Sequence, residues 1–255
     1  MGALTLMGLD ERKKPFEPLI PDVEFIEFNS FHDIRKIDEK TSCVILETIQ
    51  GSAGFILPTE GYLSSVKKKC KDVGALLILD EIQTGIGRTG KLFGFENFDC
   101  IPDIIVYGKG LGGGIPIGAF TSSKKLMDVL HVNPILGHIT TFGANPVITA
   151  AALQTLKIVL GSKIMENTLS KEKLLRQKLN HKLISEIRGV GLMLCLIMND
   201  SEIANKLVLE AKNRGLILFW LLIEKRAVRI TPPLTITDKE IEEGCDIILN
   251  ILDTM

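Results

Sequence analysis

An acid and a lysine, Asp80 and Lys109, each follow a short apolar segment of the chain. Asp80 comes directly after Ala75–Leu79, and Lys109 stands between two glycines just beyond Ile104–Tyr107. Apolar runs of this length are typical of strands in a sheet that is covered on both faces. Ligands of open α/β sheets bind beyond the carboxyl ends of the strands. The two side chains are therefore candidates for one ligand site.

A lysine and a carboxylate in one crevice have the chemistry that a pyridoxal phosphate cofactor requires. A desolvated lysine can act as an amine nucleophile and form a Schiff base with an aldehyde. A nearby carboxylate favours the protonated form of a pyridine nitrogen, and the protonated ring withdraws electrons from a carbanion at the substrate. The spacing alone is equally compatible with a second arrangement, in which Asp80 and Glu81 cap a helix and Lys109 is solvated.

The composition is that of a globular chain that can bury a sizeable core. Its 30 Lys and Arg nearly balance its 31 Asp and Glu, a net charge of −1 that argues against nucleic acid and membrane-surface partners. The five cysteines lack the paired spacing of zinc sites, so no metal is expected, and they fit a reducing compartment. The longest apolar run, Leu216–Ile223, is far below the ~20 residues of a membrane-spanning helix. With no leader ahead of the first strand, a cytoplasmic location is expected.

The order of the predicted elements is that of an α/β fold with a mainly parallel sheet, because strands and helices alternate along the chain. Strands are predicted at Val23–Phe28, Ser42–Glu47, the two apolar runs named above and Ile117–Thr121, and helices at Gly61–Val73 and Ser122–Leu130. Further on, the pattern predicts helices at Asn145–Leu160, Lys163–His181, Glu202–Arg214 and Asp238–Leu252, and strands at Ile187–Met198, Gly215–Ile223 and Ala227–Ile230. Thr237 and Glu240 predict a capping box at the start of the last helix.

Six segments resemble the class III aminotransferases and follow one another in that family's order. They are ETIQG (Glu47–Gly51), LDEIQTGIGRTG (Leu79–Gly90), PDIIVYGKGLGGGIPIGA (Pro102–Ala119), TTFGANP (Thr140–Pro146), RGVGLM (Arg188–Met193) and VRITPPL (Val228–Leu234). The resemblance covers nearly the whole chain. It implies a fold type I transferase that depends on pyridoxal 5′-phosphate (PLP). Residues 1–160 would form an incomplete large PLP-binding domain, and residues 161–255 a connecting helix and a small C-terminal α/β domain.

The resemblance also implies roles for individual residues. The family's residue at Lys109 forms the Schiff base, that at Asp80 pairs with the ring nitrogen, and that at Gln83 hydrogen-bonds the ring hydroxyl. The match to Thr141 binds the phosphate of the neighbouring subunit's cofactor, which implies a homodimer. Arg229 matches the arginine that grips a substrate carboxylate, a bidentate task suited to a guanidinium.

The implied reaction is a ping-pong transamination from an amine or amino acid donor to a 2-oxo acid such as 2-oxoglutarate. Lys109 would move a proton between the substrate carbon and the cofactor carbon. Glu47 is expected to border the cofactor and substrate pocket, with a structural or an electrostatic role.

Two departures from the family pattern keep alternatives open. The family has a further N-terminal portion, roughly 100 residues or more by the usual domain scale, with a phosphate-binding loop and an aromatic that stacks on the ring. Without it, a catalytically incomplete fragment is one interpretation of this chain. Ser52 stands where many relatives have a glutamate that pairs with the carboxylate-binding arginine, a pattern closer to dialkylglycine decarboxylase. A decarboxylating transaminase is therefore a second interpretation, and Ser52 is also compatible with a plain turn residue.

Overall fold

The computed structural model describes residues 1–132 and 134–255, which form two four-stranded sheets. In the first sheet, three parallel strands are followed by one antiparallel strand, in the order β1 (Cys43–Glu47), β2 (Leu76–Asp80), β3 (Ile104–Gly108) and β4 (Gly118–Ser122). The second sheet is antiparallel, in the order β5 (Ile184–Val190), β6 (Met193–Met198), β8 (Ala227–Ile230) and β7 (Phe219–Trp220). The predicted α/β fold with a mainly parallel first sheet is confirmed.

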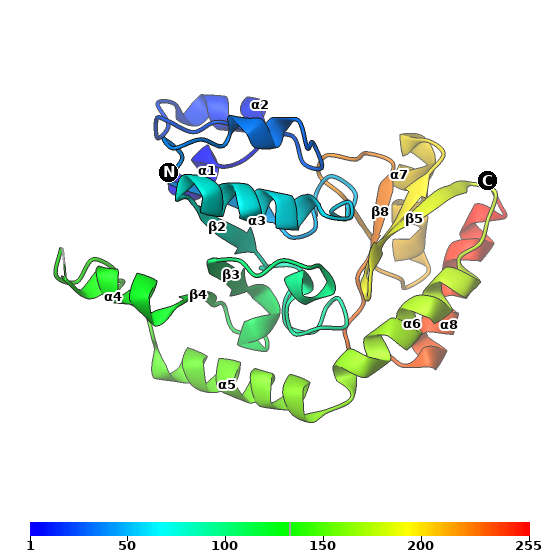
Figure 1. Ribbon diagram of the computed structural model, residues 1–255. Helices are drawn as coiled ribbons and strands as arrows, with labels where there is room; N and C mark the ends of the chain where they lie inside the picture. Colours follow the sequence, from blue (N-terminus) through cyan, green and yellow to red (C-terminus); the bar gives the residue numbers. More distant parts are fainter. Residues whose placement is uncertain (133) are drawn as a thin grey trace.

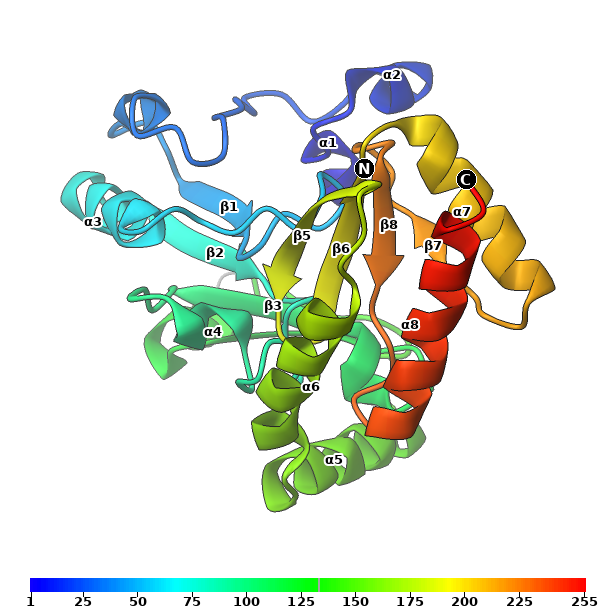
Figure 2. The ribbon, with the colours of Figure 1, turned by 90° about the vertical axis from the view of Figure 1, so that its right-hand side faces the viewer.

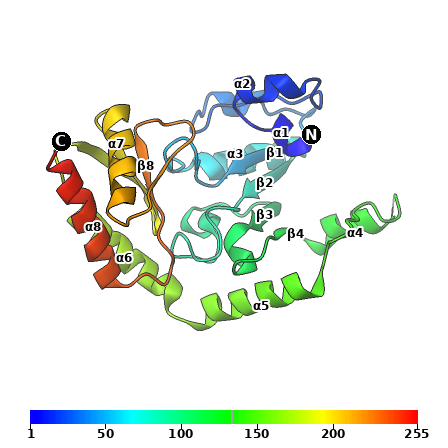
Figure 3. The ribbon, with the colours of Figure 1, turned by 180° about the vertical axis from the view of Figure 1, so that it is seen from behind.

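The helices cover one side of each sheet, and one pair of helices extends along the edge of the molecule. α3 (Tyr62–Val73) lies against the first sheet, whereas α6 (Ile164–Lys178), α7 (Ser201–Asn213) and α8 (Asp238–Leu252) lie against the second (Figures 1 and 2). α4 (Lys124–Val132) and α5 (Pro146–Gly161) form an arm that leads from β4 to α6 (Figure 3). The remaining short helices are α1 (Gly2–Thr5), α2 (Asp10–Lys13), η1 (Lys14–Phe16), η2 (Asp33–Lys36), η3 (Gly94–Asn97) and η4 (Lys109–Gly112).

The first sheet buries one face more completely than the other. Leu77 and Leu79 of β2 are fully buried and pack with Val66 and Cys70 of α3. Their neighbours on the opposite face of β2 are only half-buried, and Ile45 of β1 is 37% exposed. The expectation that both faces are covered is therefore wrong for the described residues, because α3 packs on one face alone.

The second sheet has a larger core, formed with the helices of the C-terminal part. α8 presents Ile241, Cys245 and Ile248 to this core, at the spacing of one helical face. The helix begins with the predicted capping box: the Glu240 carboxylate accepts from the Thr237 amide at 2.8 Å, and the Glu240 amide donates to the Thr237 hydroxyl at 3.3 Å. This reciprocal pair fixes the first turn of α8.

Three strand predictions differ from the structure. Val23–Phe28 has no strand geometry, since these residues have no ladder partner among those described. Ile187–Met198 is two strands, β5 and β6, which reverse at Gly191; its φ of +63° is readily adopted only by glycine. Within Gly215–Ile223 only Phe219 and Trp220 pair with a neighbour. In each case apolar character was visible in the sequence, but the pairing partner was not.

A small apolar cluster joins the two sheets. Ile49 and Phe55, from the turn region that follows β1, pack against Met193, Cys195 and Ile197 of β6. The Cys195 thiol also donates to the Gly54 carbonyl at 3.3 Å. The segment after β1 is therefore fixed directly onto the second sheet, which determines how the strand ends of the first sheet face it.

No single helix among the described residues has both the length and the apolar character needed to cross a membrane. Of the helices that the structure describes, only α5 and α6 taken together meet that test, and they are bent by 68° at the break between them.

Candidate functional site

Three predicted site residues meet at the carboxyl ends of the parallel strands. Glu47 at the end of β1 is paired with Asp80 at the end of β2, and Asp80 is paired with Val106 of β3, three residues before Lys109. Burial raises the pKa of the Glu47 carboxyl, and a hydrogen bond from the Gly51 amide opposes that shift. The charge of Asp80 raises this pKa further, whereas the charge of Lys109 lowers it. The two acids and the lysine therefore lie within electrostatic reach of one another.

Lys109 occupies an unusual backbone position directly after β3. Its φ is +41°, in the left-handed region that lysine rarely adopts, and such conformations gather at functional sites. The preceding Gly108 has no room for a side chain, since a Cβ there would lie 2.8 Å from the Ile117 carbonyl oxygen. η4, which begins at Lys109, is held by Leu111, which packs with Ala152 and Val159 of α5.

The Lys109 side chain is exposed in the described chain. The expectation of a desolvated amine is therefore wrong for the described residues. The alternative in which Asp80 and Glu81 cap a helix is also wrong, since residues 81–93 form turns and no helix begins there.

Asp80 and Gln83 are held in place by local contacts. The Asp80 carboxylate accepts from the Ile82 amide at 2.8 Å. The Gln83 amide nitrogen lies beside Gly51, where a Cβ would approach it to 2.3 Å and would lie 3.2 Å from the Glu47 carboxylate. The Gly51 amide in turn donates to that carboxylate at 3.0 Å. Glu47, Asp80, Gln83 and Lys109 thus form one group around the strand ends.

Gly51→Ala is expected to displace the Gln83 amide and to weaken ligand binding at this group with little loss of stability. The atoms that a new methyl group would strike are the ends of flexible side chains, so the backbone is not forced to move. For the cofactor that the family resemblance implies, PLP, we expect the dissociation constant to rise about tenfold, the equivalent of one lost hydrogen bond. Gly161→Ala is the matched control, because a Cβ at Gly161 meets nothing within 4 Å. A fluorescence titration that gives both variants the same dissociation constant would contradict this prediction.

Arg229 stands in a row of residues on the face of the second sheet that meets the first. Arg188, Cys195, Arg229 and Phe219 are direct partners across β5, β6, β8 and β7, so their side chains share one face. Because Cys195 of this row contacts Gly54, the row faces the turn that begins at Gly51. The Arg229 Nε is buried and has no hydrogen-bond partner among the described residues. A buried donor without a partner is costly, which indicates a place for an acceptor such as a carboxylate.

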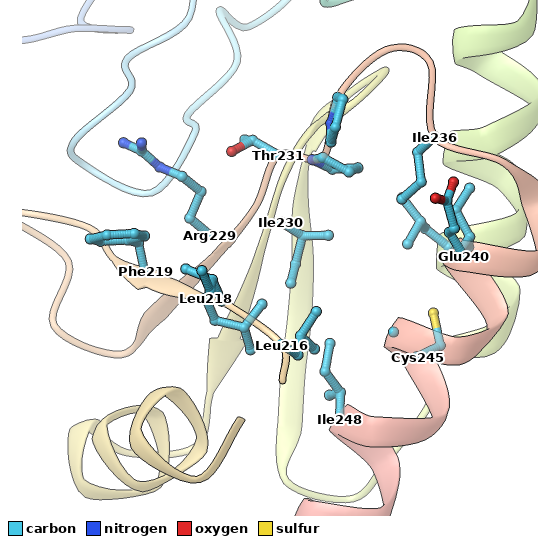
Figure 4. A pocket seen from close by; sticks show the side chains of 16 residues that line it. Leu216, Leu218, Phe219, Arg229, Ile230, Thr231, Ile236, Glu240, Cys245 and Ile248 are labelled. Carbon is cyan, nitrogen blue, oxygen red and sulfur yellow. The ribbon is translucent and has the colours of Figure 1, made fainter. Parts of the chain in front are cut away.

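A cavity of about 310 Å³ lies beside β8, and Arg229 and Phe219 are among the residues that line it. Leu216, Ile230, Ile248 and Cys245 contribute to its mainly apolar lining, whereas the Arg229 guanidinium extends away from them (Figure 4). Neither Asp80 nor Lys109 lines it. The cavity is therefore not the site that the strand ends form, and the strand ends remain the candidate site.

Thr141 is not brought to the other predicted residues. It is exposed in the turn that precedes α5, and no hydrogen bond among residues 1–132 and 134–255 involves it. Within one chain, Thr141 therefore makes no contribution to the Asp80–Lys109 group.

The family model for class III aminotransferases matches residues 2–252. The chain belongs to this family. It is 38% identical to a putrescine aminotransferase of Pectobacterium atrosepticum, in an alignment that covers 100% of this chain and 58% of that protein.

Solved structures of aminotransferases show the same fold. The ornithine aminotransferase of Toxoplasma gondii ME49 superposes with a TM-score of 0.89 at 31% identity, over 99% of this chain and 61% of that one. The N-acetylornithine aminotransferase of Stenotrophomonas maltophilia K279a gives a TM-score of 0.79 at 31% identity, over 91% and 62%. A second Toxoplasma gondii ornithine aminotransferase structure, with a TM-score of 0.88, has PLP at partial occupancy in its active site. This class III aminotransferase chain therefore spans about three fifths of the length of these relatives.

Two residues that shape the site of this class III chain were missed by sequence reasoning. Glu81 is fully buried behind Asp80, and Arg88 donates to the carbonyl oxygens of Leu192 at 3.1 Å and Pro232 at 2.6 Å. Burial lowers the pKa of Arg88 to about 10. The only signal in the sequence was their place inside the segment Leu79–Gly90, and the resemblance assigned neither of them a role.

Proposed function

We propose that this chain is the catalytic part of a PLP-dependent transaminase that moves an amino group from an amine or amino acid to a 2-oxo acid such as 2-oxoglutarate. The observation that carries the proposal is the grouping of Lys109 with Asp80, Glu47 and Gln83 at the strand ends of a class III family member. Relatives named for putrescine, ornithine and N-acetylornithine make these three compounds the first donors to test.

The side chains at the strand ends fit PLP. A carboxylate, a neutral amide and a primary amine are the groups that a protonated pyridine nitrogen, a ring hydroxyl and an aldehyde would require. The bare backbone at Gly51 and Gly108 keeps space beside them, since a Cβ at either position would collide with its neighbours. When bound, the cofactor supplies an aldehyde and an electron-withdrawing ring.

Each residue of the site then has a defined task. Asp80 holds a proton at the ring nitrogen, and Gln83 donates to or accepts from the ring hydroxyl. The Lys109 amine would bind the aldehyde, and it would carry a proton to and from the substrate carbon. Arg229 orients a substrate carboxylate through its guanidinium, and Glu47 borders the pocket.

A homodimer in which Thr141 completes the neighbouring subunit's site is part of the proposal. The turn that holds Thr141 is surrounded by exposed apolar side chains, with Ile135 79%, Ile139 72% and Phe142 80% exposed. Several large apolar side chains exposed within eight residues of one another support an interface at this turn. The division into a part of the large domain at residues 1–160 and a C-terminal part at residues 161–255 is also proposed. A cytoplasmic location is proposed as well, because five free cysteines favour a reducing compartment.

A decarboxylating transaminase is the second candidate function. The one feature that favours it is Ser52, which stands where many relatives have a glutamate that pairs with the carboxylate-binding arginine. The two candidates differ in whether carbon dioxide is released from a dialkylglycine donor.

The proposal is tested by reconstitution. The purified chain is incubated with PLP and reduced with borohydride, and the modified lysine is located by peptide mass spectrometry. We expect modification at Lys109, followed in unreduced samples by conversion of 2-oxoglutarate to glutamate with one of the three donors. Label at Lys109 without turnover would support the interpretation of an incomplete fragment. Label spread over several surface lysines would overturn the proposed function.

A further inference from the structure

We propose that Glu81 is a positioning residue that sets the geometry of the candidate cofactor site from behind. This inference rests on the proposed function. It starts from a regular alternation at the strand ends: Thr48 follows Glu47, Glu81 follows Asp80, and Thr84 follows Gln83. The first member of each pair is half-buried and the second is buried. The buried members therefore lie behind the half-buried ones, on the inner side of the candidate site.

The three buried members meet at the Glu81 carboxylate. Its Oε1 accepts from the Thr48 hydroxyl at 2.6 Å and from the Phe95 amide at 2.7 Å. Its Oε2 accepts from the Thr84 hydroxyl and from the Gly94 amide, the latter at 2.7 Å. The Glu81 side chain has no exposed surface. Each oxygen thus has two donors, and the carboxylate ties the end of β1, the end of β2, the Gln83 loop and η3 to one point.

Thr48, Glu81 and Thr84 each directly follow a residue of the candidate site along the chain. Moving Thr48 moves Glu47, moving Glu81 moves Asp80, and moving Thr84 moves Gln83. The packing leaves little slack, since a Cβ at Gly94 would lie 2.8 Å from the Thr84 Cβ and 3.0 Å from the Glu81 carboxylate. Glu81 therefore acts on the cofactor site through its neighbours and does not enter the site itself.

Glu81→Gln is a sharp test because it keeps the shape and removes one acceptor. Each carboxylate oxygen accepts a hydrogen bond from a backbone N–H. In either orientation of the glutamine side chain, its NH2 group would therefore point at one of these N–H donors, and that hydrogen bond could not form. One backbone hydrogen bond is lost and Asp80 is released from its fixed position. The Ile82 amide donates to the Asp80 carboxylate at 2.8 Å, so hydrogen exchange of this amide reports the position of Asp80.

The matched control is Glu172→Gln in α6. Glu172 accepts from the Gly191 amide at 2.6 Å and from the Arg176 guanidinium at 2.8 Å, and it serves the second sheet. Its replacement also removes an acceptor from a carboxylate that is largely buried, and it lowers stability at a distance from Asp80. The properties of Glu81→Gln and Glu172→Gln are compared at temperatures equally far below the Tm of each variant. Thr48→Val, which removes a single donor to Glu81, serves in place of Glu81→Gln should that variant fail to fold.

Two measurements decide the inference. Hydrogen exchange of the Ile82 amide in the cofactor-free chain is expected to become about tenfold faster in Glu81→Gln and to stay unchanged in Glu172→Gln. The PLP dissociation constant is expected to rise about tenfold in Glu81→Gln alone, with a change in the pH dependence of the bound cofactor's absorbance. Unchanged Ile82 exchange in Glu81→Gln, or equal effects in both variants, would overturn the inference. Failure of the unmodified chain to take up PLP at Lys109 would count against the proposed function, and the exchange result would then decide the role of Glu81 by itself.

Discussion

Lys109→Ala abolishes borohydride-stable attachment of PLP to the chain, and with it any transamination. The variant keeps Asp80 and Gln83, so it retains noncovalent contacts to the ring but has no amine at this position for the aldehyde. We expect no labelled peptide from the region around residue 109 and a loss of turnover of at least about a thousandfold, as is usual when a nucleophile that also transfers protons is removed.

The measurement is peptide mapping after reduction, with Lys206→Ala as the control. Lys206 is an exposed residue of α7 on the second sheet, so its replacement removes one surface amine and leaves the strand ends untouched. The absorbance of the mixture at each PLP concentration gives the affinity in parallel. Stoichiometric label in Lys109→Ala, at any other single lysine, would show that the amine nucleophile had been assigned to the wrong residue.

The stability of Lys109→Ala is expected to equal that of the unmodified chain, since alanine carries a Cβ as lysine does. The residue lies in the left-handed region, which is unfavourable for every residue with a Cβ, and its side chain is exposed. Loss of function without loss of fold is what separates a residue retained for chemistry from one retained for packing. The positive φ thus supports the same assignment as the chemistry of the amine.

The site could be predicted from the sequence wherever local pattern determines position. Asp80 and Lys109 each follow an apolar strand, and the ends of parallel strands meet at one edge, so their proximity followed from strand order. The helix boundaries were close for the same reason: the Thr237 cap lies next to the element that it begins. The resemblance added Gln83 and Arg229, which no local pattern would have selected.

What could not be predicted depends on contacts between distant residues. The sequence offered Glu81 only as a helix cap beside Asp80, because its donors Thr48 and Phe95 lie 33 residues before it and 14 after it. The half-open face of the first sheet was equally hidden. An apolar run such as Ala75–Leu79 reads the same whether or not anything covers its second side, so the exposure of Lys109 required the three-dimensional structure.

Arg88→Met is the second change for which a large effect is expected, and the effect is on the junction of the two sheets. The Arg88 guanidinium donates to the Leu192 and Pro232 carbonyls, and its own carbonyl accepts from the Leu192 amide at 3.0 Å. Methionine fills a similar volume but donates nothing, so two carbonyl oxygens lose their partner. At about 1–3 kcal/mol for each of the two carbonyl oxygens left unpaired, the free energy of unfolding should fall by roughly 2–6 kcal/mol. For a chain of this size that corresponds to a fall in Tm of about 4–15 °C.

The loss should also reach the site, because Arg88 follows Gln83 in one loop and Pro232 follows Arg229 after β8. With the link removed, the carboxylate-binding arginine and the cofactor-binding loop are no longer held at a fixed separation, so substrate affinity should fall more than PLP affinity. Arg35→Met, at an exposed arginine of η2, is the control for loss of charge alone. Calorimetry and a donor titration check the two parts separately. An unchanged Tm in Arg88→Met would mean that this guanidinium does not hold the junction, where the Ile49 and Phe55 cluster and the Cys195–Gly54 hydrogen bond also join the sheets.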